Sequence, residues 1–226
     1  MTTSLDPSAL VNFKIFCIGA NKTGSTSMEQ LLIDLGLNVG PQRHGELTTA
    51  DISKGDYSSL FAYVYQYTAF QDVPFAVKSV YVALDALFPR SKFILTIRDP
   101  EDWFTSFLSH HKRALKTGDR VPTLRDFSGH DYLYEGFRQL KFEWDWLIKV
   151  DPQTLQSSTD WALAFDKQHF INLYNQRNLD VIRHFHGRKD LLVVDITKEK
   201  TTEKIVRFLG LPAECITEMP HLNKGS

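Results

Sequence analysis

The sequence predicts an α/β fold with a central, mostly parallel sheet flanked by helices. Three observations lead to this prediction: short apolar runs, helical patterns between them, and a glycine-bearing loop directly after the first run. The runs are near-continuous rather than alternating, which is typical of strands buried on both faces of a parallel sheet. The predicted strands are residues 13–18, 75–77, 93–97 and 191–194.

Helical patterns occupy the segments between these runs. The expected helices span residues 25–35, 80–87, 101–115, 132–150, 160–185 in one or two pieces, and 202–209. Gly36 and Gly210 stand where the first and last of them end, as is common for C-caps. Strands that alternate with helices in this way indicate helices on both faces of one sheet.

Length and composition fit one domain over residues 1–226. The chain is 42% hydrophobic and 23% charged, which is a globular composition. Two segments fit the alternation poorly, 40–75 and 117–161, and we expect them to shape the acceptor site or form a lid. Their many aromatic rings either fill the core or wall a pocket.

The charge balance excludes some partners. A net charge of −1 argues against a general nucleic-acid binder and against a polybasic membrane protein, so any anion site must be local. Two cysteines give no disulfide framework, and no run reaches the length of a membrane span. The sequence starts without a signal-peptide pattern, and we therefore expect a cytoplasmic protein.

The loop after the first run predicts a phosphate site. Backbone N–H groups in such a loop, and the helix N-terminus that follows, attract anions. Gly19 and Gly24 have the spacing of a nucleotide-triphosphatase P-loop, but Ser25 and Thr26 stand where that motif has Lys-Ser or Lys-Thr. The lysine lies inside the loop instead, at Lys22. This displacement favours a phosphate-ester cofactor handled without a magnesium–triphosphate site.

A second anion motif follows the run at 93–97. Asp99 is a good N-cap and Pro100 suits the first helical position, so Arg98 should lie at the carboxyl end of a strand, at the same edge as Lys22. Helical spacing places a polar face on the next helix, formed by Asp102, Ser106, Ser109, His110 and Arg113. A guanidinium and a hydroxyl would suit a second phosphate. The alternative is that Arg98 pairs with Asp99 or Asp102.

Together the two motifs resemble those of the sulfotransferase family, which transfers a sulfuryl group from 3′-phosphoadenosine-5′-phosphosulfate. Residues 22–26 resemble the 5′-phosphosulfate loop, and residues 97–106 resemble the 3′-phosphate motif with its eight-residue step from arginine to serine. The resemblance implies a P-loop-like sulfotransferase architecture without a metal. It also implies a small-molecule or sugar acceptor with a hydroxyl or amine, and neither nucleic acid nor membrane as partner.

The resemblance also implies residue roles. Lys22 would contact the bridging oxygen, Arg98 and Ser106 would bind the 3′-phosphate, and the loop would hold the 5′-phosphate. The loop residues are Thr23, Gly24, Ser25, Thr26 and Ser27. Lys78 resembles a family lysine near the reacting groups, although the residues after it differ from the family pattern, and Lys224 resembles a late basic residue over the 3′-phosphate.

Three residues are candidates for the general base. The acceptor must lose a proton, and we favour His44 for this role, with Glu46 and Asp72 as alternatives. His44 and Glu46 are expected in a loop after the first helix, and Asp72 just before the strand at 75–77. His110 and His111 are expected to be structural or to face the phosphate. A P-loop kinase or nucleotide triphosphatase with a modified loop, or a binding module without chemistry, remain alternative functions.

Overall fold

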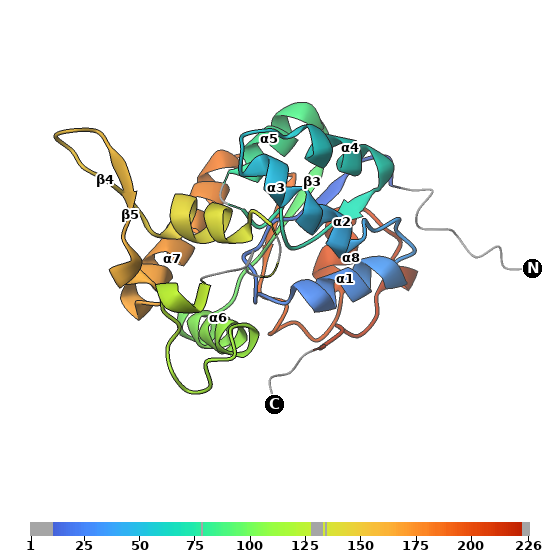
Figure 1. Ribbon diagram of the computed structural model, residues 1–226. Coiled ribbons are helices and arrows are strands. Elements are labelled where there is room, and N and C mark those ends of the chain that lie inside the picture. The colour runs from blue at the N-terminus through green and yellow to red at the C-terminus, as the bar shows by residue number, and fades with distance from the viewer. Residues whose placement is uncertain (1–10, 78, 128–132, 134, 223–226) are drawn as a thin grey trace, which may run out of the picture.

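A parallel sheet forms the centre of the molecule (Figure 1). The computed structural model describes residues 11–77, 79–127, 133 and 135–222. The sheet has four strands in the order β2-β1-β3-β6, all parallel. They are β1 (Ile15–Cys17), β2 (Ala69–Phe70), β3 (Lys92–Thr96) and β6 (Leu191–Val194). The predicted α/β class with a central parallel sheet is therefore confirmed.

Alternate residues of each strand enter two separate apolar cores. Phe16, Phe70 and Phe93 point to one face of the sheet, whereas Ile15 and Ile94 point to the other. Both faces are covered by helices, which explains why the strands read as continuous apolar runs. One face carries α1 (Ser25–Asp34) and α8 (Glu203–Leu209); the other carries α4 (Ser58–Gln66), α5 (Val80–Leu87), α6 (Pro100–Ala114) and α7 (Lys167–His184).

The larger core is built from aromatic rings. The Phe16 ring lies 5.3 Å from that of Phe70, 5.7 Å from Phe75 and 5.4 Å from Phe93, measured between centroids. Offset and tilted pairs at these separations are favourable beyond the area that they bury. Rings of the 40–75 segment thus fill the core, although Tyr65 is 71% exposed.

The strand predicted at residues 75–77 is wrong. The second strand is β2 (Ala69–Phe70), and residues 73–77 form turns after the cis Val73–Pro74 peptide. The Ala76 N–H donates to the Asp72 carbonyl (2.9 Å), so this backbone bonds locally and not to a neighbouring strand. Phe75 is apolar because it enters the core, and not because it belongs to the sheet.

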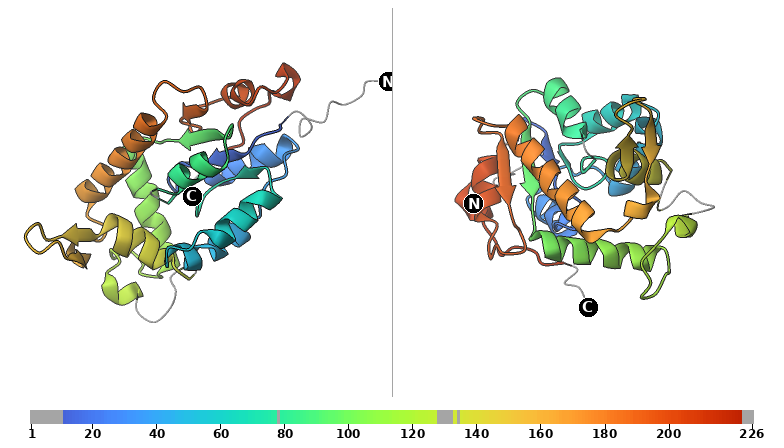
Figure 2. Two further views of the ribbon diagram at one scale, coloured as in Figure 1. Left: turned by 90° about the horizontal axis from the view of Figure 1, so that it is seen from above. Right: turned by 90° about the vertical axis from the view of Figure 1, so that its left-hand side faces the viewer.

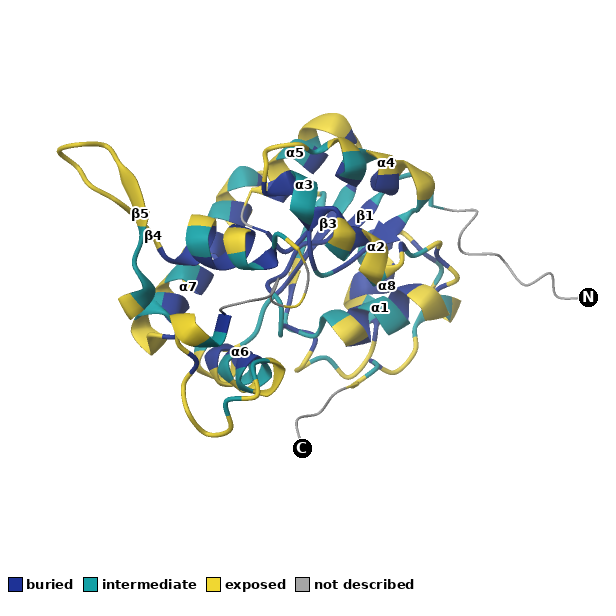
Figure 3. Cartoon of the chain, viewed as in Figure 1, coloured by how far each residue is buried: buried dark blue, intermediate teal, exposed yellow. Residues whose placement is uncertain are grey.

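The two irregular segments contain more structure than predicted. Residues expected in a loop form α2 (Gln42–Leu47), which is followed by α3 (Thr49–Ile52). The helix expected at 132–150 is a π-helix, η3 (Gln139–Trp146), followed by an antiparallel hairpin. The hairpin strands β4 (Ile148–Val150) and β5 (Ser157–Thr159) project from the body and are mostly exposed (Figures 1 and 3).

The remaining short elements lie in the segments after α6, before α7 and after α8. They are the 3₁₀ turns η2 (Leu124–Phe127), η4 (Trp161–Leu163) and η5 (Ala213–Cys215). The helix expected at 160–185 is thus divided into η4 and α7. α7 lies beside α6 (Figure 2). In the part of the chain that the structure describes, no helix is both long and apolar enough to cross a membrane.

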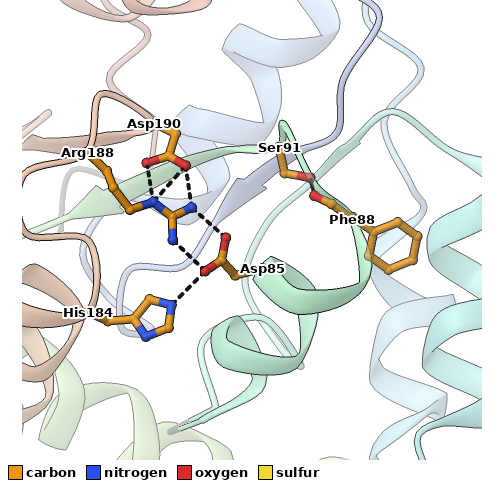
Figure 4. Close-up of polar contacts among 6 residues, drawn as sticks. All are labelled: Asp85, Phe88, Ser91, His184, Arg188 and Asp190. Carbon is orange, nitrogen blue, oxygen red and sulfur yellow. Dashed lines mark hydrogen bonds and ion pairs between the residues drawn. The ribbon is translucent and has the colours of Figure 1, made fainter.

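An ion-pair network joins α5, the end of α7 and the start of β6 (Figure 4). The Arg188 guanidinium donates to both carboxylate oxygens of Asp85, at 2.6 and 2.7 Å, and also to Asp190. His184 Nε2 lies 2.8 Å from Asp85 Oδ2. These hydrogen bonds, that of Arg188 first, lower the pKa of Asp85.

Candidate functional site

The predicted phosphate loop, residues 18–24, connects β1 to α1 and has a fixed backbone. Gly24 precedes α1 with φ of 102°, and a Cβ there would lie 2.5 Å from the Ile196 side chain. Only glycine fits both constraints. Thr23 is buried, and its hydroxyl lies 2.6 Å from both the Ala20 carbonyl and the Thr96 hydroxyl. No side chain caps the start of α1 in the described residues, so its N-terminus remains suited to an anion.

The second motif is held at the end of β3. Asp99 caps α6 by accepting from the backbone N–H groups of Glu101 (3.0 Å) and Asp102 (3.2 Å). Among the described residues Arg98 forms no ion pair with either aspartate. Its backbone is fixed by Tyr174, whose hydroxyl accepts from the Arg98 N–H (2.8 Å) and donates to the Arg98 carbonyl (3.0 Å).

Trp103 connects the two motifs. Its indole N–H donates to the Asn21 carbonyl in the phosphate loop (3.0 Å), and its ring stacks on Tyr174 at 4.3 Å. Tyr174 in turn holds Arg98. The loop after β1 and the loop after β3 are therefore kept in register by one buried indole.

Both motifs line one cavity of about 830 Å³. The residues predicted from the sequence that line it are Lys22, Gly24, Ser25, Thr26, Ser27, Arg98 and Ser106. Thr23 lies beneath the loop and does not line the cavity. The whole polar face expected on α6 opens into the same space: Asp102, Ser109, His110 and Arg113.

Three cations, Lys22, Arg98 and Arg113, line this cavity. Burial lowers the pKa of Lys22, and Arg113 and Arg98 lower it further, whereas Asp72 opposes them. Burial, Lys22 and Arg113 lower the pKa of His110 to about 4, so its imidazole is neutral at pH 7. An anion bound here would relieve this mutual repulsion.

Asp72 lies beside the phosphate loop, after the end of β2 and not before a strand. Its carboxylate accepts hydrogen bonds from the Asn21 amide and from the Ser25 hydroxyl (2.6 Å). Asp72 has φ of 59°, a left-handed conformation that aspartate tolerates better than most residues. It does not line the cavity.

The other predicted site residues are not brought to this cavity. His44 and Glu46 lie on α2; the His44 side chain is exposed, and Glu46 pairs with Arg43 (3.1 Å). Neither lines the cavity. Lys78 and Lys224 lie outside the described residues.

One wall of the cavity was missed at the sequence level. Ile196 and Thr197 follow β6, and residues 220–222 complete the wall. The Leu222 N–H donates to the Ser27 hydroxyl (3.0 Å). The available signal was the predicted strand at 191–194, since its carboxyl end must meet the same sheet edge as the two motifs.

The cavity offers backbone N–H groups, hydroxyls and cations, which are ligands for oxoanions. Within the described ranges, no group of three or more His, Cys, Asp or Glu residues could hold a metal ion. Comparison with curated proteins gives no match. A family model described as "Sulfotransferase domain" matches residues 14–226, which include both motifs and every strand. The chain therefore belongs to the sulfotransferase family.

Proposed function

We propose that this protein transfers a sulfuryl group from 3′-phosphoadenosine-5′-phosphosulfate to a hydroxyl or amine of a small-molecule or sugar acceptor. One observation supports the donor: the Lys22 loop and the Arg98–Ser106 pair line a single cavity. A nucleotide with phosphates at both ends of its ribose needs two such anion sites. Family membership supports sulfuryl transfer in general.

The described residues fit this donor. No side chain caps the start of α1 in the described residues, so its backbone N–H groups are left to a phosphate. The Arg98 guanidinium lines the cavity and forms no ion pair with a carboxylate within the described residues. Ser106 lies eight residues further on, on the face of α6 that borders the cavity. When bound, the donor supplies a sulfuryl group whose bond to the bridging oxygen breaks as the acceptor attacks, leaving the electron pair on the 5′-phosphate.

Lys22 would stabilise the charge that develops during this step. Its ammonium is carried by a loop whose backbone is fixed by Thr23 and Trp103, so little reorganisation is needed. The nearby Asp72 carboxylate favours the charged form of the Lys22 side chain. Arg98 and Ser106 would hold the remote phosphate and orient the donor.

Three residues are proposed as candidates for the general base that accepts the acceptor's proton. Asp72 is the one that hydrogen-bonds to the phosphate loop, through Asn21 and Ser25. His44 and Glu46 lie on α2 and outside the cavity lining. Rate profiles against pH for Asp72→Asn, His44→Ala and Glu46→Gln would identify the base, because its loss should cost about 100-fold or more.

Thermal-shift titration tests the donor. We expect 3′,5′-adenosine bisphosphate without magnesium to raise the Tm by about 5–10 °C at 100 times its Kd, and adenosine 5′-monophosphate to raise it much less. Arg98→Ala should remove this difference between the two nucleotides. Arg183→Ala is the matched control, since Arg183 is exposed on the last turn of α7. Stabilisation by Mg–ATP but not by the bisphosphate would contradict the proposal and support a kinase.

A further inference from the structure

A second cavity, of about 610 Å³, lies along the outer side of α6. It shares Thr105, Ser109 and Arg113 with the donor cavity, so the two hollows adjoin across one helix face. The proposed donor contacts lie on the loop and at the N-terminal half of α6. The second cavity follows the C-terminal half, and nothing in the proposed donor site uses it.

This second cavity is strongly basic. Among the described residues, four cations line it, Lys112, Arg113, Lys116 and Lys167, and Asp119 is the single carboxylate. The overall net charge of the chain is −1, so this concentration is local. Such a concave patch of one sign attracts an anion by focusing the electrostatic field.

Two of the four cations, Arg113 and Lys116, have no polar partner in the described chain. Lys167 pairs with Glu101, and the Lys112 ammonium donates to the Asp119 carbonyl (2.6 Å). No ion pair or side-chain hydrogen bond of Arg113 or Lys116 occurs within the described residues. Their charges are therefore available to a ligand.

Arg113 lies between the second cavity and the reacting centre. Its charge contributes to the lowered pKa of both Lys22 and His110, so it is electrostatically close to the loop. Ser106 and Arg113 are seven residues apart, which is about 10 Å along a helix. Arg113 thus lies about two helical turns beyond the residue proposed to hold the remote phosphate, and it also lines the second cavity.

We propose that the second cavity binds an oxoanion of the acceptor, and that the acceptor is a small acidic molecule. A carboxylate, phosphate or sulfate at one end would rest against Arg113, Lys112 and Lys116, and would direct a hydroxyl or amine at the other end toward Lys22. This inference rests on the proposed function, and it narrows the acceptor class.

Matched acceptor pairs, in which one member carries an anionic group that the other lacks, test this inference. Suitable pairs are 4-hydroxyphenylacetate with its amide, glucuronate with glucuronamide, and glycerol 3-phosphate with glycerol. Calorimetry on protein saturated with 3′,5′-adenosine bisphosphate measures binding, and labelled donor measures transfer. We expect the acidic member of at least one pair to bind about tenfold more tightly, and this preference to shrink from 50 to 500 mM salt.

A second experiment removes positive charges at the end of α6 and just after it. Lys112→Gln with Lys116→Asn should reduce the preference for the acidic member about tenfold and leave the Kd of the bisphosphate within twofold. Asparagine suits the left-handed backbone of Lys116 (φ 55°), and the single Lys116→Asn variant serves if the double one is unstable. Lys149→Gln with Lys189→Gln removes the same charge from exposed sites that line neither cavity.

The outcomes separate the two proposals. Equal binding of acidic and neutral members in all three pairs, with bisphosphate binding intact, would overturn the acidic acceptor and leave the donor proposal standing. An acidic preference that survives in the Lys112/Lys116 variants would overturn it as well. A protein that does not bind the bisphosphate would overturn both.

Discussion

At the scale of single residues, two basic side chains that line the candidate site differ in charge. Lys22 is a cation whose pKa is lowered by burial and by Arg113 and Arg98. His110 faces the same cavity as a neutral imidazole. The site therefore combines a charge that can stabilise a leaving group with a neighbour that does not add to the repulsion.

Lys22→Ala should lower kcat about 100- to 1000-fold, because a positioned charge at the leaving group would be lost. Its ammonium makes no hydrogen bond among the described residues, so the Tm should change little. Steady-state transfer and a thermal melt measure the two effects. Lys54→Ala, which removes an exposed lysine, is the control. Near-normal turnover would remove Lys22 from the mechanism.

His110 should make stability depend on pH. Its pKa is about 4 in the folded protein and about 6.5 when unfolded, so the unfolded chain binds more protons between these values. Stability must then fall as the pH drops from 6.5 toward 4. We expect His110→Gln to reduce the loss of Tm between pH 6.5 and 5.5 by about 2–4 °C. Parallel melting curves of the two proteins would contradict this.

At the scale of elements, strands and helices with continuous sequence patterns were predictable, whereas the short strand β2 and the buried turns that follow it were not. The runs that form β1, β3 and β6 are continuous, and the helix ends at Gly36 and Gly210 carry the left-handed backbone that glycine favours. β2 has only two residues, Ala69 and Phe70, too few to show a pattern. The nearby apolar run at 75–77 lies in buried turns, and its sequence is apolar because it is buried, as that of a strand would be.

The candidate site was predictable to the same degree. Each of its two anion motifs has a characteristic residue spacing directly after a predicted strand. Lys22, Arg98 and Ser106 could therefore be placed at the carboxyl edge of the sheet from sequence alone. Arg113 was visible as part of a polar helix face, but its ligand-facing role depends on which space that face borders. The wall at 220–222 could not be foreseen, because only tertiary packing brings Leu222 to Ser27.

The contact between α6 and the phosphate loop gives a prediction at this scale. Trp103→Phe keeps the stacking on Tyr174 but leaves the Asn21 carbonyl without its donor, at a cost of about 1–3 kcal/mol. We expect weaker bisphosphate binding by calorimetry, about 5- to 20-fold, together with a lower Tm. Trp144→Phe is the control, since Trp144 is 48% exposed. Unchanged affinity would show that the loop keeps its shape without the indole.

At the scale of the whole molecule, apolar packing covers the two faces of the sheet, and positive charge gathers at its carboxyl edge. Both sheet faces are sealed by apolar cores, whereas the carboxyl edge gathers cations around α6. The Asp85–Arg188 network fastens α5 to the segment between α7 and β6 (Figure 4).

Asp85→Asn should lower the free energy of unfolding by about 1 kcal/mol at pH 7, because the network is partly exposed. The pKa of Asp85 is lowered in the fold, so its contribution is present above the ordinary aspartate value. That contribution is lost as the pH falls through the lowered pKa. Urea denaturation at pH 7 and at pH 3 measures both. A variant as stable as the parent at pH 7 would contradict the prediction.

The hydrogen bond from Leu222 to Ser27 spans 195 residues. At ordinary translation speeds these two residues leave the ribosome about 10–40 s apart. The segment of β1 and α1 is thus synthesised long before the far wall of the candidate cavity exists. Premature termination between Thr197 and Pro220 would release a polypeptide that carries both anion motifs but lacks residues 220–222 of this wall.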